Sequence, residues 1–300
     1  MSQIEQSAVP LHASWRDYLT LTKPRVVALI MLTSVVGTLL ATPGLPPLDA
    51  LVLGNLGIAL AAASAAAVNH VLDSRIDAHM ARTRRRPLPA GHLTHRQALT
   101  FALALGVASM AVLVAFVNVL TAVLSFCSLI VYAVVYTVWL KRATPQNIVI
   151  GGAAGAAPPV LGWVAVTNHV DAHALLLFMI IFAWTPPHFW ALAIARRRDY
   201  EKVHIPMLPV THGVELTRLH VLLYTVILCL VTLLPYMTGM SGLIYLAAAV
   251  ILNARFLWQA ALLKVTRRDD LPMRLFRYSI TYLMWLFLAL LVDHYLRLGR

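Results

Sequence analysis

Nine long apolar segments are the feature that most limits how this chain can fold. Each is close to the roughly 20 residues that an α-helix needs to cross about 30 Å of hydrocarbon. They lie at residues 25–42, 48–69, 96–115, 119–139, 148–166, 173–195, 217–237, 241–263 and 275–296. With 60% hydrophobic and only 12% charged residues, the sequence predicts an all-α polytopic membrane protein with nine transmembrane helices.

The basic residues lie almost entirely in alternate loops. Of the 24 Lys and Arg residues, 21 lie in the N-terminal segment or in the loops after the second, fourth, sixth and eighth apolar segments. Because cytoplasmic loops are enriched in Lys and Arg, we expect a cytoplasmic N-terminus and a periplasmic C-terminus in a bacterial inner membrane. This topology accounts for the formal net charge of +12, so we expect membrane lipids as surroundings and no nucleic-acid partner.

No hydrophilic stretch is long enough to fold as a separate domain. We therefore expect residues 1–24 to be a cytoplasmic segment, residues 25–296 to be a single transmembrane domain, and residues 297–300 to be a tail. The two cysteines lie within apolar segments, which is typical of small buried residues rather than of a disulfide. Any chemistry must then use the cytoplasmic loops and the helix ends beneath them.

A polar stripe closes the second apolar segment, where residues 69–87 read NHVLDSRIDAHMARTRRRP. Asn69, Asp73 and Asp77 are spaced four residues apart, so on a helix they form one face over two turns. Two carboxylates one turn apart repel each other, and Mg²⁺ relieves this while keeping ligand positions for substrate phosphates. We interpret all three as Mg²⁺ ligands; the alternative is carboxylates that are solvated or paired with Arg75 and Arg82.

Four arginines follow this stripe directly, at positions 82, 84, 85 and 86. Guanidinium groups bind phosphate oxygens through paired hydrogen bonds. A basic cytoplasmic loop is common in any membrane protein, but its place beside the two aspartates favours a diphosphate substrate. The expected active site therefore lies on the cytoplasmic side.

Asp199 and Lys202 form a second candidate site, in the stretch RRRDYEKVHIPMLPV at 196–210. An acidic side chain that faces the first stripe would hold a second Mg²⁺, and Lys202 would neutralise a leaving diphosphate. The alternative is an exposed ion pair on a solvated loop.

His188 lies inside the sixth apolar segment, in WTPPHFWALA at 184–193. A histidine at this depth is either a hydrogen-bonded packing residue or a contact for a planar acceptor. The sequence alone leaves both interpretations open.

Several stretches resemble the intramembrane prenyltransferases of the UbiA type, and among them the protoheme IX farnesyltransferases, also called heme O synthases. Besides the stripe, the similarity lies in LTKPRVV, KRATPQNIVIGGAAGAAPPVLGW, WTPPHFWALAI and DYEKVHIPMLPVTHG, which begin at residues 21, 141, 184 and 199. The resemblance implies a helix bundle around a central cavity. It also implies Mg²⁺ as cofactor, farnesyl diphosphate and heme b as substrates, and heme O as product. A heme A synthase or a terminal oxidase assembly would then be a partner.

The same resemblance assigns roles to particular residues of this chain. It implies that Asn69, Asp73 and Asp77 hold Mg²⁺, that Asp199 belongs to the second motif, and that Arg82 and Arg86 contact the phosphates. The residues themselves add Lys202 as a further catalytic candidate, and His188 and Arg196 as candidates for substrate binding.

The second candidate site departs from the family pattern at two places. Asp199 is not followed by a second aspartate four residues later, and Val203-His204 replaces a small Ala-Gly pair. The first departure leaves the number of metal ions open. Two other functions also remain open: prenyl transfer to an aromatic or quinone-precursor acceptor, and membrane transport through the buried charges.

Overall fold

The computed structural model describes residues 13–80 and 83–298, so the predicted phosphate contact Arg82 lies outside the described residues. Every regular element in these two ranges is helical. The elements are α1 (Trp15–Leu21), α2 (Pro24–Leu40), the π-helix η1 (Asp49–Gly54), α3 (Asn55–His79), α4 (His95–Phe116), α5 (Val119–Ile130), the π-helix η2 (Val131–Leu140), α6 (Lys141–Ala143), α7 (Asn147–Ala156), α8 (Pro158–Thr167), α9 (Ala172–Ala195), α10 (Arg197–Lys202), α11 (Leu208–Thr211), α12 (Val214–Val231), α13 (Leu234–Met237), α14 (Leu243–Val265) and α15 (Leu271–Leu298).

Eight helices of the described chain are long and apolar enough to cross a membrane, and a ninth results if the bent pair α1 and α2 counts as one. These two helices meet at 52°. Alone, α2 has 17 residues and is about 26 Å long, slightly short of the hydrocarbon thickness. All nine apolar segments thus form helices, which confirms the predicted fold class of a multi-pass, all-α membrane protein.

The helix ends extend beyond several predicted segments. The second span continues through the polar stripe to His79, and the last begins at Leu271 rather than at 275. Pro272 fits the first turn of a helix, where its missing N–H has no partner to lose. Polar residues therefore continue these helices past the apolar region.

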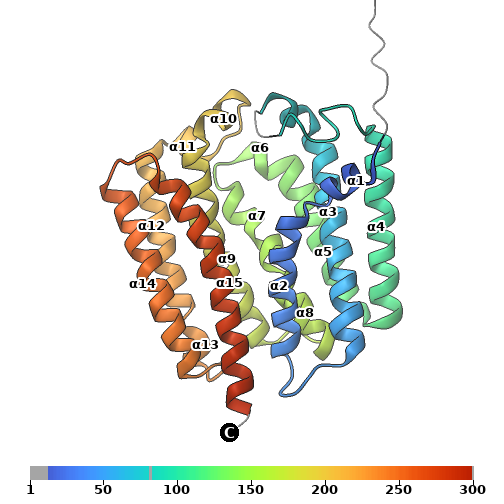
Figure 1. The fold of residues 1–300 in the computed structure, drawn as a ribbon, viewed down its shortest axis with the longest axis vertical. Helices are drawn as coiled ribbons and strands as arrows, with labels where there is room; N and C mark the ends of the chain where they lie inside the picture. The colour runs from blue at the N-terminus through green and yellow to red at the C-terminus, as the bar shows by residue number, and fades with distance from the viewer. Residues whose placement is uncertain (1–12, 81–82, 299–300) are drawn as a thin grey trace, which may run out of the picture.

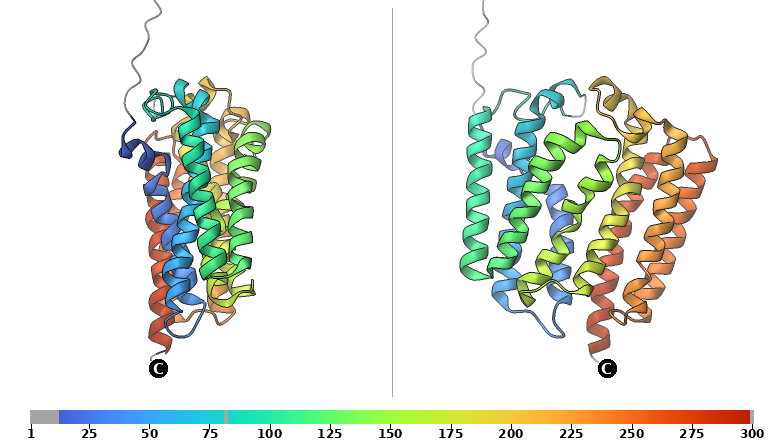
Figure 2. Two further views of the ribbon diagram at one scale, coloured as in Figure 1. Left: turned by 90° about the vertical axis from the view of Figure 1, so that its right-hand side faces the viewer. Right: turned by 180° about the vertical axis from the view of Figure 1, so that it is seen from behind.

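The long helices run side by side in a flattened bundle (Figures 1 and 2). Helices α3, α4 and α5 lie on one side, and α12 and α14 lie on the other. The loop after α3 lies at the same end of the bundle as α6 and α10, and the C-terminus lies at the opposite end (Figure 1). The two predicted site regions therefore share one end of the molecule.

Small residues allow α3 and α4 to pack closely. The hydroxyls of Ser64 and Ser109 donate to the main-chain oxygens of Ala102 and Gly57 on the facing helix, at 2.8 and 2.7 Å. Such contacts stabilise helix pairs in lipid, where no hydrophobic force brings apolar helices together. This packing fixes the helix that carries the polar stripe.

Helix α2 crosses α8 closely enough that only glycine fits at the contact. A Cβ on Gly162 would lie 2.1 Å from the main-chain oxygen of Ser34. We expect Gly162→Ala to destabilise the protein by about 1–3 kcal/mol, because the two backbones must separate. Its apparent unfolding temperature in detergent should fall, whereas Gly155→Ala should not lower it, since a Cβ there has no neighbour within 4 Å. Equal unfolding temperatures for Gly162→Ala and the unmodified protein would contradict this account.

Candidate active site

The predicted polar stripe forms one buried face near the C-terminal end of α3. Asn69, Asp73 and Asp77 are 4%, 4% and 5% exposed. The Asn69 side-chain amide donates to Asp73 Oδ2 at 2.9 Å. The alternative of solvated carboxylates is therefore excluded, and two buried carboxylates at this depth require cationic or hydrogen-bonding partners.

A basic side chain contacts each polar residue of the stripe. Lys141 Nζ lies 2.6 Å from Asp73 Oδ2, and Arg86 Nη1 lies 2.5 Å from Asp77 Oδ2. Lys23 Nζ donates to Asn69 Oδ1 at 2.5 Å. Three cations thus surround two carboxylates, and the group carries a net positive charge.

Lys141 reaches Asp73 from the end of the π-helix η2. Thr137, one turn earlier, accepts a hydrogen bond from the Asn69 amide at 3.2 Å and donates to the Tyr132 main-chain oxygen at 2.9 Å. A π-helix has more residues per turn than an α-helix, and short π segments often occur at functional sites. Here the π-helical segment and the start of α6 bring Thr137 and Lys141 to the same stripe.

Arg86 reaches Asp77 because the chain turns back after α3. The Thr83 hydroxyl donates to the Asp77 main-chain oxygen at 3.0 Å, and the Arg86 N–H donates to the Thr83 oxygen at 2.9 Å. These bonds satisfy a helix-terminal carbonyl and place the guanidinium over the carboxylate. Of the two predicted phosphate contacts, Arg86 is therefore at the stripe.

Lys23 adopts a left-handed backbone conformation with φ of +50° directly before Pro24. A non-glycine residue with positive φ is uncommon, and such strain is often found at functional sites. The conformation ends α1 and starts α2, and from there the side chain contacts Asn69.

His70 is a further buried polar group beside the stripe. It is 2% exposed, and neither ring nitrogen has a hydrogen-bond partner among the described residues. A buried histidine without partners is costly unless a ligand supplies them. The sequence offered no signal for it beyond its place next to Asn69.

The second predicted site lies on the short helix α10. Lys202 and Arg196 are exposed, and Asp199 is half-buried. No group of three His, Cys, Asp or Glu side chains that could hold a metal occurs in the described ranges, so Asp199 does not join Asp73 and Asp77 in one cluster. Tyr200 nevertheless lies near Tyr136, which itself lies near Asp73, and this connects the α10 loop to the first site.

His204 explains one departure from the family pattern. Its φ is +52°, in the left-handed region that glycine adopts without strain. Histidine is among the few other residues enriched there. His204 therefore adopts a backbone conformation that the expected glycine would adopt without strain.

His188 is buried within α9 and held by packing. Its Nδ1 lies 2.6 Å from the Ser279 hydroxyl of α15. The rings of Trp184 and Phe276 stack on the imidazole with centroids 4.2 and 4.6 Å away. These contacts favour the packing interpretation.

Sequence reasoning missed Lys23, Lys141 and Thr137 as members of the site. Lys23 lies within LTKPRVV and Lys141 begins KRATPQN, and both stretches carry the family resemblance. That signal identified the stretches without saying which side chain faces the aspartates.

Comparison with known proteins assigns the chain to a family independently of the site geometry. The model of the UbiA prenyltransferase family matches residues 30–291. The protoheme IX farnesyltransferase of Methylococcus capsulatus is 62% identical over 283 residues, which cover 94% of this chain and 95% of that protein. The protein of the same name from Alkalilimnicola ehrlichii is 61% identical over 99% of this chain and 98% of its own length.

Solved structures agree with the fold. A digeranylgeranylglyceryl phosphate synthase superposes with a TM-score of 0.78 at 18% identity, over 93% of this chain and 98% of that one. A UbiA homologue from Archaeoglobus fulgidus bound to GPP and Mg²⁺ superposes with a TM-score of 0.63 at 17% identity, over 91% and 99%. Because the family model spans most of the sequence and the relatives match over nearly their full length, this chain belongs to the UbiA prenyltransferase family.

Proposed function

We propose that this protein transfers the farnesyl group of farnesyl diphosphate to a vinyl group of heme b. Addition of water then gives heme O, and diphosphate is released. The observation that carries the proposal is the buried stripe of Asn69, Asp73 and Asp77 with three basic side chains against it. Such a group is complementary to a diphosphate, and the relatives at about 60% identity bear the name protoheme IX farnesyltransferase.

Mg²⁺ is the proposed cofactor, and the stripe would hold it. Carboxylate and amide oxygens are the ligands that Mg²⁺ prefers, and it keeps further positions for water and phosphate. Both carboxylates already attract a cationic group to within 2.6 Å, so the donor set suits a positive ion. When bound, the ion would neutralise charge on the diphosphate leaving group. Asp199 remains a proposed ligand for a second ion.

The basic side chains of the stripe would bind the diphosphate. Lys141 and Arg86 would turn from the carboxylates to phosphate oxygens, which also accept charge-assisted hydrogen bonds. Lys23 and the unpartnered His70 lie within the same group and would add donors. Positive groups held where negative charge develops stabilise the transition state more than the ground state.

The apolar helices would protect the reacting centre from water. As the bond between the first farnesyl carbon and the diphosphate oxygen breaks, both electrons leave with the oxygen and an allylic cation forms. The π electrons of the heme vinyl group then form the new carbon–carbon bond. Water adds its hydroxyl to the resulting cation and loses a proton. The cavity expected at the centre of the bundle would hold both substrates away from bulk water.

The proposed setting is a bacterial inner membrane, with the N-terminus and the active site on the cytoplasmic side. The alternation of basic and non-basic loops supports this orientation. Residues 25–296 would act as a single catalytic domain. Heme O serves terminal oxidases, so a heme A synthase or an oxidase assembly is a proposed partner that would accept the product.

The mass of the heme product tests the proposal directly. Purified protein supplied with heme b, farnesyl diphosphate and Mg²⁺ should yield a heme heavier by one farnesyl group plus one hydroxyl group, because both additions occur on one vinyl group. Removing the divalent cation with a chelator should abolish the product, and adding Mg²⁺ back should restore it. If a prenylated product formed from hydroxybenzoate but not from heme b, the acceptor would be an aromatic compound instead of heme b. Ion flux without consumption of farnesyl diphosphate would favour the transport function.

A further inference from the structure

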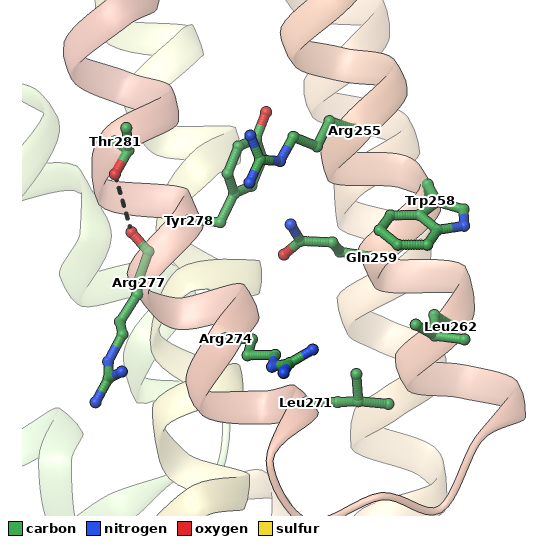
Figure 3. A pocket seen from close by; sticks show the side chains of 9 residues that line it. All are labelled: Arg255, Trp258, Gln259, Leu262, Leu271, Arg274, Arg277, Tyr278 and Thr281. Atoms are coloured by element: carbon green, nitrogen blue, oxygen red, sulfur yellow. Dashed lines mark hydrogen bonds between the residues drawn. The ribbon is translucent and has the colours of Figure 1, made fainter.

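A pocket of about 490 Å³ lies between α14 and α15 (Figure 3). It is distinct from the active site, since none of the residues assigned to that site lines it. Three arginines contribute to its wall, namely Arg255 from α14 and Arg274 and Arg277 from α15. Such a concentration of positive charge beside membrane-spanning helices calls for an anionic ligand.

Two of these arginines have no carboxylate partner. Among the described residues no carboxylate lies within ion-pair distance of Arg255 or Arg277, whereas Arg274 Nε lies 2.9 Å from Asp270 Oδ2. The hydrogen bond from Arg268 holds the pKa of Asp270 below its usual value, so Arg274 keeps an anionic partner. The positive charge available to a ligand therefore belongs to Arg255 and Arg277.

The Arg255 guanidinium lies over the Tyr278 ring, 4.6 Å from its centroid. Stacking on an aromatic face orients a guanidinium without neutralising its charge. The Tyr278 hydroxyl in turn donates to the Leu252 main-chain oxygen at 2.8 Å, which fixes the ring. Figure 3 shows Arg255 and Gln259 of α14 facing Tyr278 of α15 across the pocket.

Gln259 adds an unused hydrogen-bond acceptor to the pocket wall. Its Oε1 atom is buried and has no partner among the described residues. An acceptor beside two cations suits a ligand that carries both a phosphate and a hydroxyl group.

The pocket faces away from the centre of the bundle. Its α15 residues Arg274, Arg277 and Thr281 are spaced three and four apart, so they form one helix face. Phe276 and Ser279, which contact His188 of α9, lie on the opposite face. Trp258, at the rim of the pocket, is 63% exposed, as is typical of tryptophan at a membrane interface.

We propose that this pocket binds the headgroup of an anionic phospholipid in the leaflet on the side of the α14–α15 loop. Phosphatidylglycerol fits the wall best: its phosphate would lie between Arg255 and Arg277, and a glycerol hydroxyl would donate to Gln259. The acyl chains would lie along the apolar outer surface of α14 and α15. This site is independent of the prenyl-transfer reaction.

Native mass spectrometry of the full-length protein in detergent tests this site. Phosphatidylglycerol should bind more tightly than phosphatidylcholine. Arg277→Gln and Arg255→Gln should each weaken phosphatidylglycerol binding about five-fold, because each arginine near an anionic headgroup contributes about 1 kcal/mol. Arg267→Gln is the matched control, since it removes the same charge from the neighbouring loop at a residue that pairs with Glu215 and does not line the pocket, and it should leave the affinity unchanged.

Four results would overturn the proposal. Equal losses in Arg277→Gln and Arg267→Gln would mean that only the overall surface charge matters. Equal affinity for phosphatidylcholine would mean that the headgroup charge is not recognised. Displacement of the lipid by inorganic phosphate at equal concentration would indicate a site for a free anion. Displacement by heme would assign the pocket to the propionates of the acceptor.

Discussion

Asp73→Asn should lower the rate of farnesyl transfer by about 10²–10³-fold or more, because removal of one charge-stabilising group from a buried catalytic site has effects of this size. Asp73 lies at the centre of the stripe, where it contacts both Asn69 and Lys141. Asp73 is a proposed ligand of Mg²⁺, and this ion would neutralise the negative charge of the diphosphate as it leaves. Single-turnover formation of the heavier heme product at saturating Mg²⁺ measures the effect. Near-normal turnover would reject the metal-binding role.

The controls for this variant separate catalysis from folding. Asp269→Asn makes the same change on an exposed loop and should retain full activity. Asp73→Asn also leaves the partly buried Lys141 ammonium without its carboxylate, which destabilises a protein. The double variant Asp73→Asn with Lys141→Met removes both charges of this pair and leaves the net charge of the group as it is in the unmodified protein. If the pair were only structural, the double variant would recover activity; we expect it to remain as inactive as Asp73→Asn.

Lys141→Met should lower kcat/KM for farnesyl diphosphate by about 10²-fold, the size expected for one preorganised cation at a developing negative charge. Lys141 is one of two cations that touch a stripe carboxylate. Its loss removes a phosphate contact and leaves Asp73 with the Asn69 amide. We expect the Mg²⁺ concentration for half-maximal activity to change as well, since the carboxylate no longer shares its charge with an ammonium group. Steady-state rates at varied substrate and varied Mg²⁺ give both quantities.

Lys264→Met provides the matched comparison for this prediction. Lys264 lies at the end of α14, and its ammonium is 3.8 Å from the exposed Glu215. Exposed ion pairs of this kind contribute little, so activity should stay unchanged. Equal losses in the two lysine variants would indicate a general effect of surface charge on the membrane protein and would contradict a specific role for Lys141.

The spans could be predicted from the sequence because the bilayer imposes a simple local rule. A backbone without water must form its own hydrogen bonds, so a segment of about 20 apolar residues in lipid becomes a helix. All nine predicted segments are helical. The alignment of Asn69, Asp73 and Asp77 on one face is also local, since it follows from the helical repeat.

The partners of that face could not be predicted in the same way. Lys141 is 68 residues from Asp73 along the chain, and Lys23 is 46 residues from Asn69. The crossing of the helices and the register of η2 decide which distant cation reaches a buried carboxylate. A local sequence pattern holds information on neither of these two features. For the same reason the sequence does not determine how far Asp199, in the second predicted site, lies from the two carboxylates of the stripe, and its role toward a second Mg²⁺ stays a prediction.

The sequence by itself determined the membrane spans and the polar stripe, because each depends on neighbours within a few turns of one helix. Only the tertiary structure decided which cations neutralise the stripe, that both aromatic contacts hold His188 in packing, and that a basic pocket lies between α14 and α15. Those features come from side chains far apart in the chain, and the packing of whole helices brings them together.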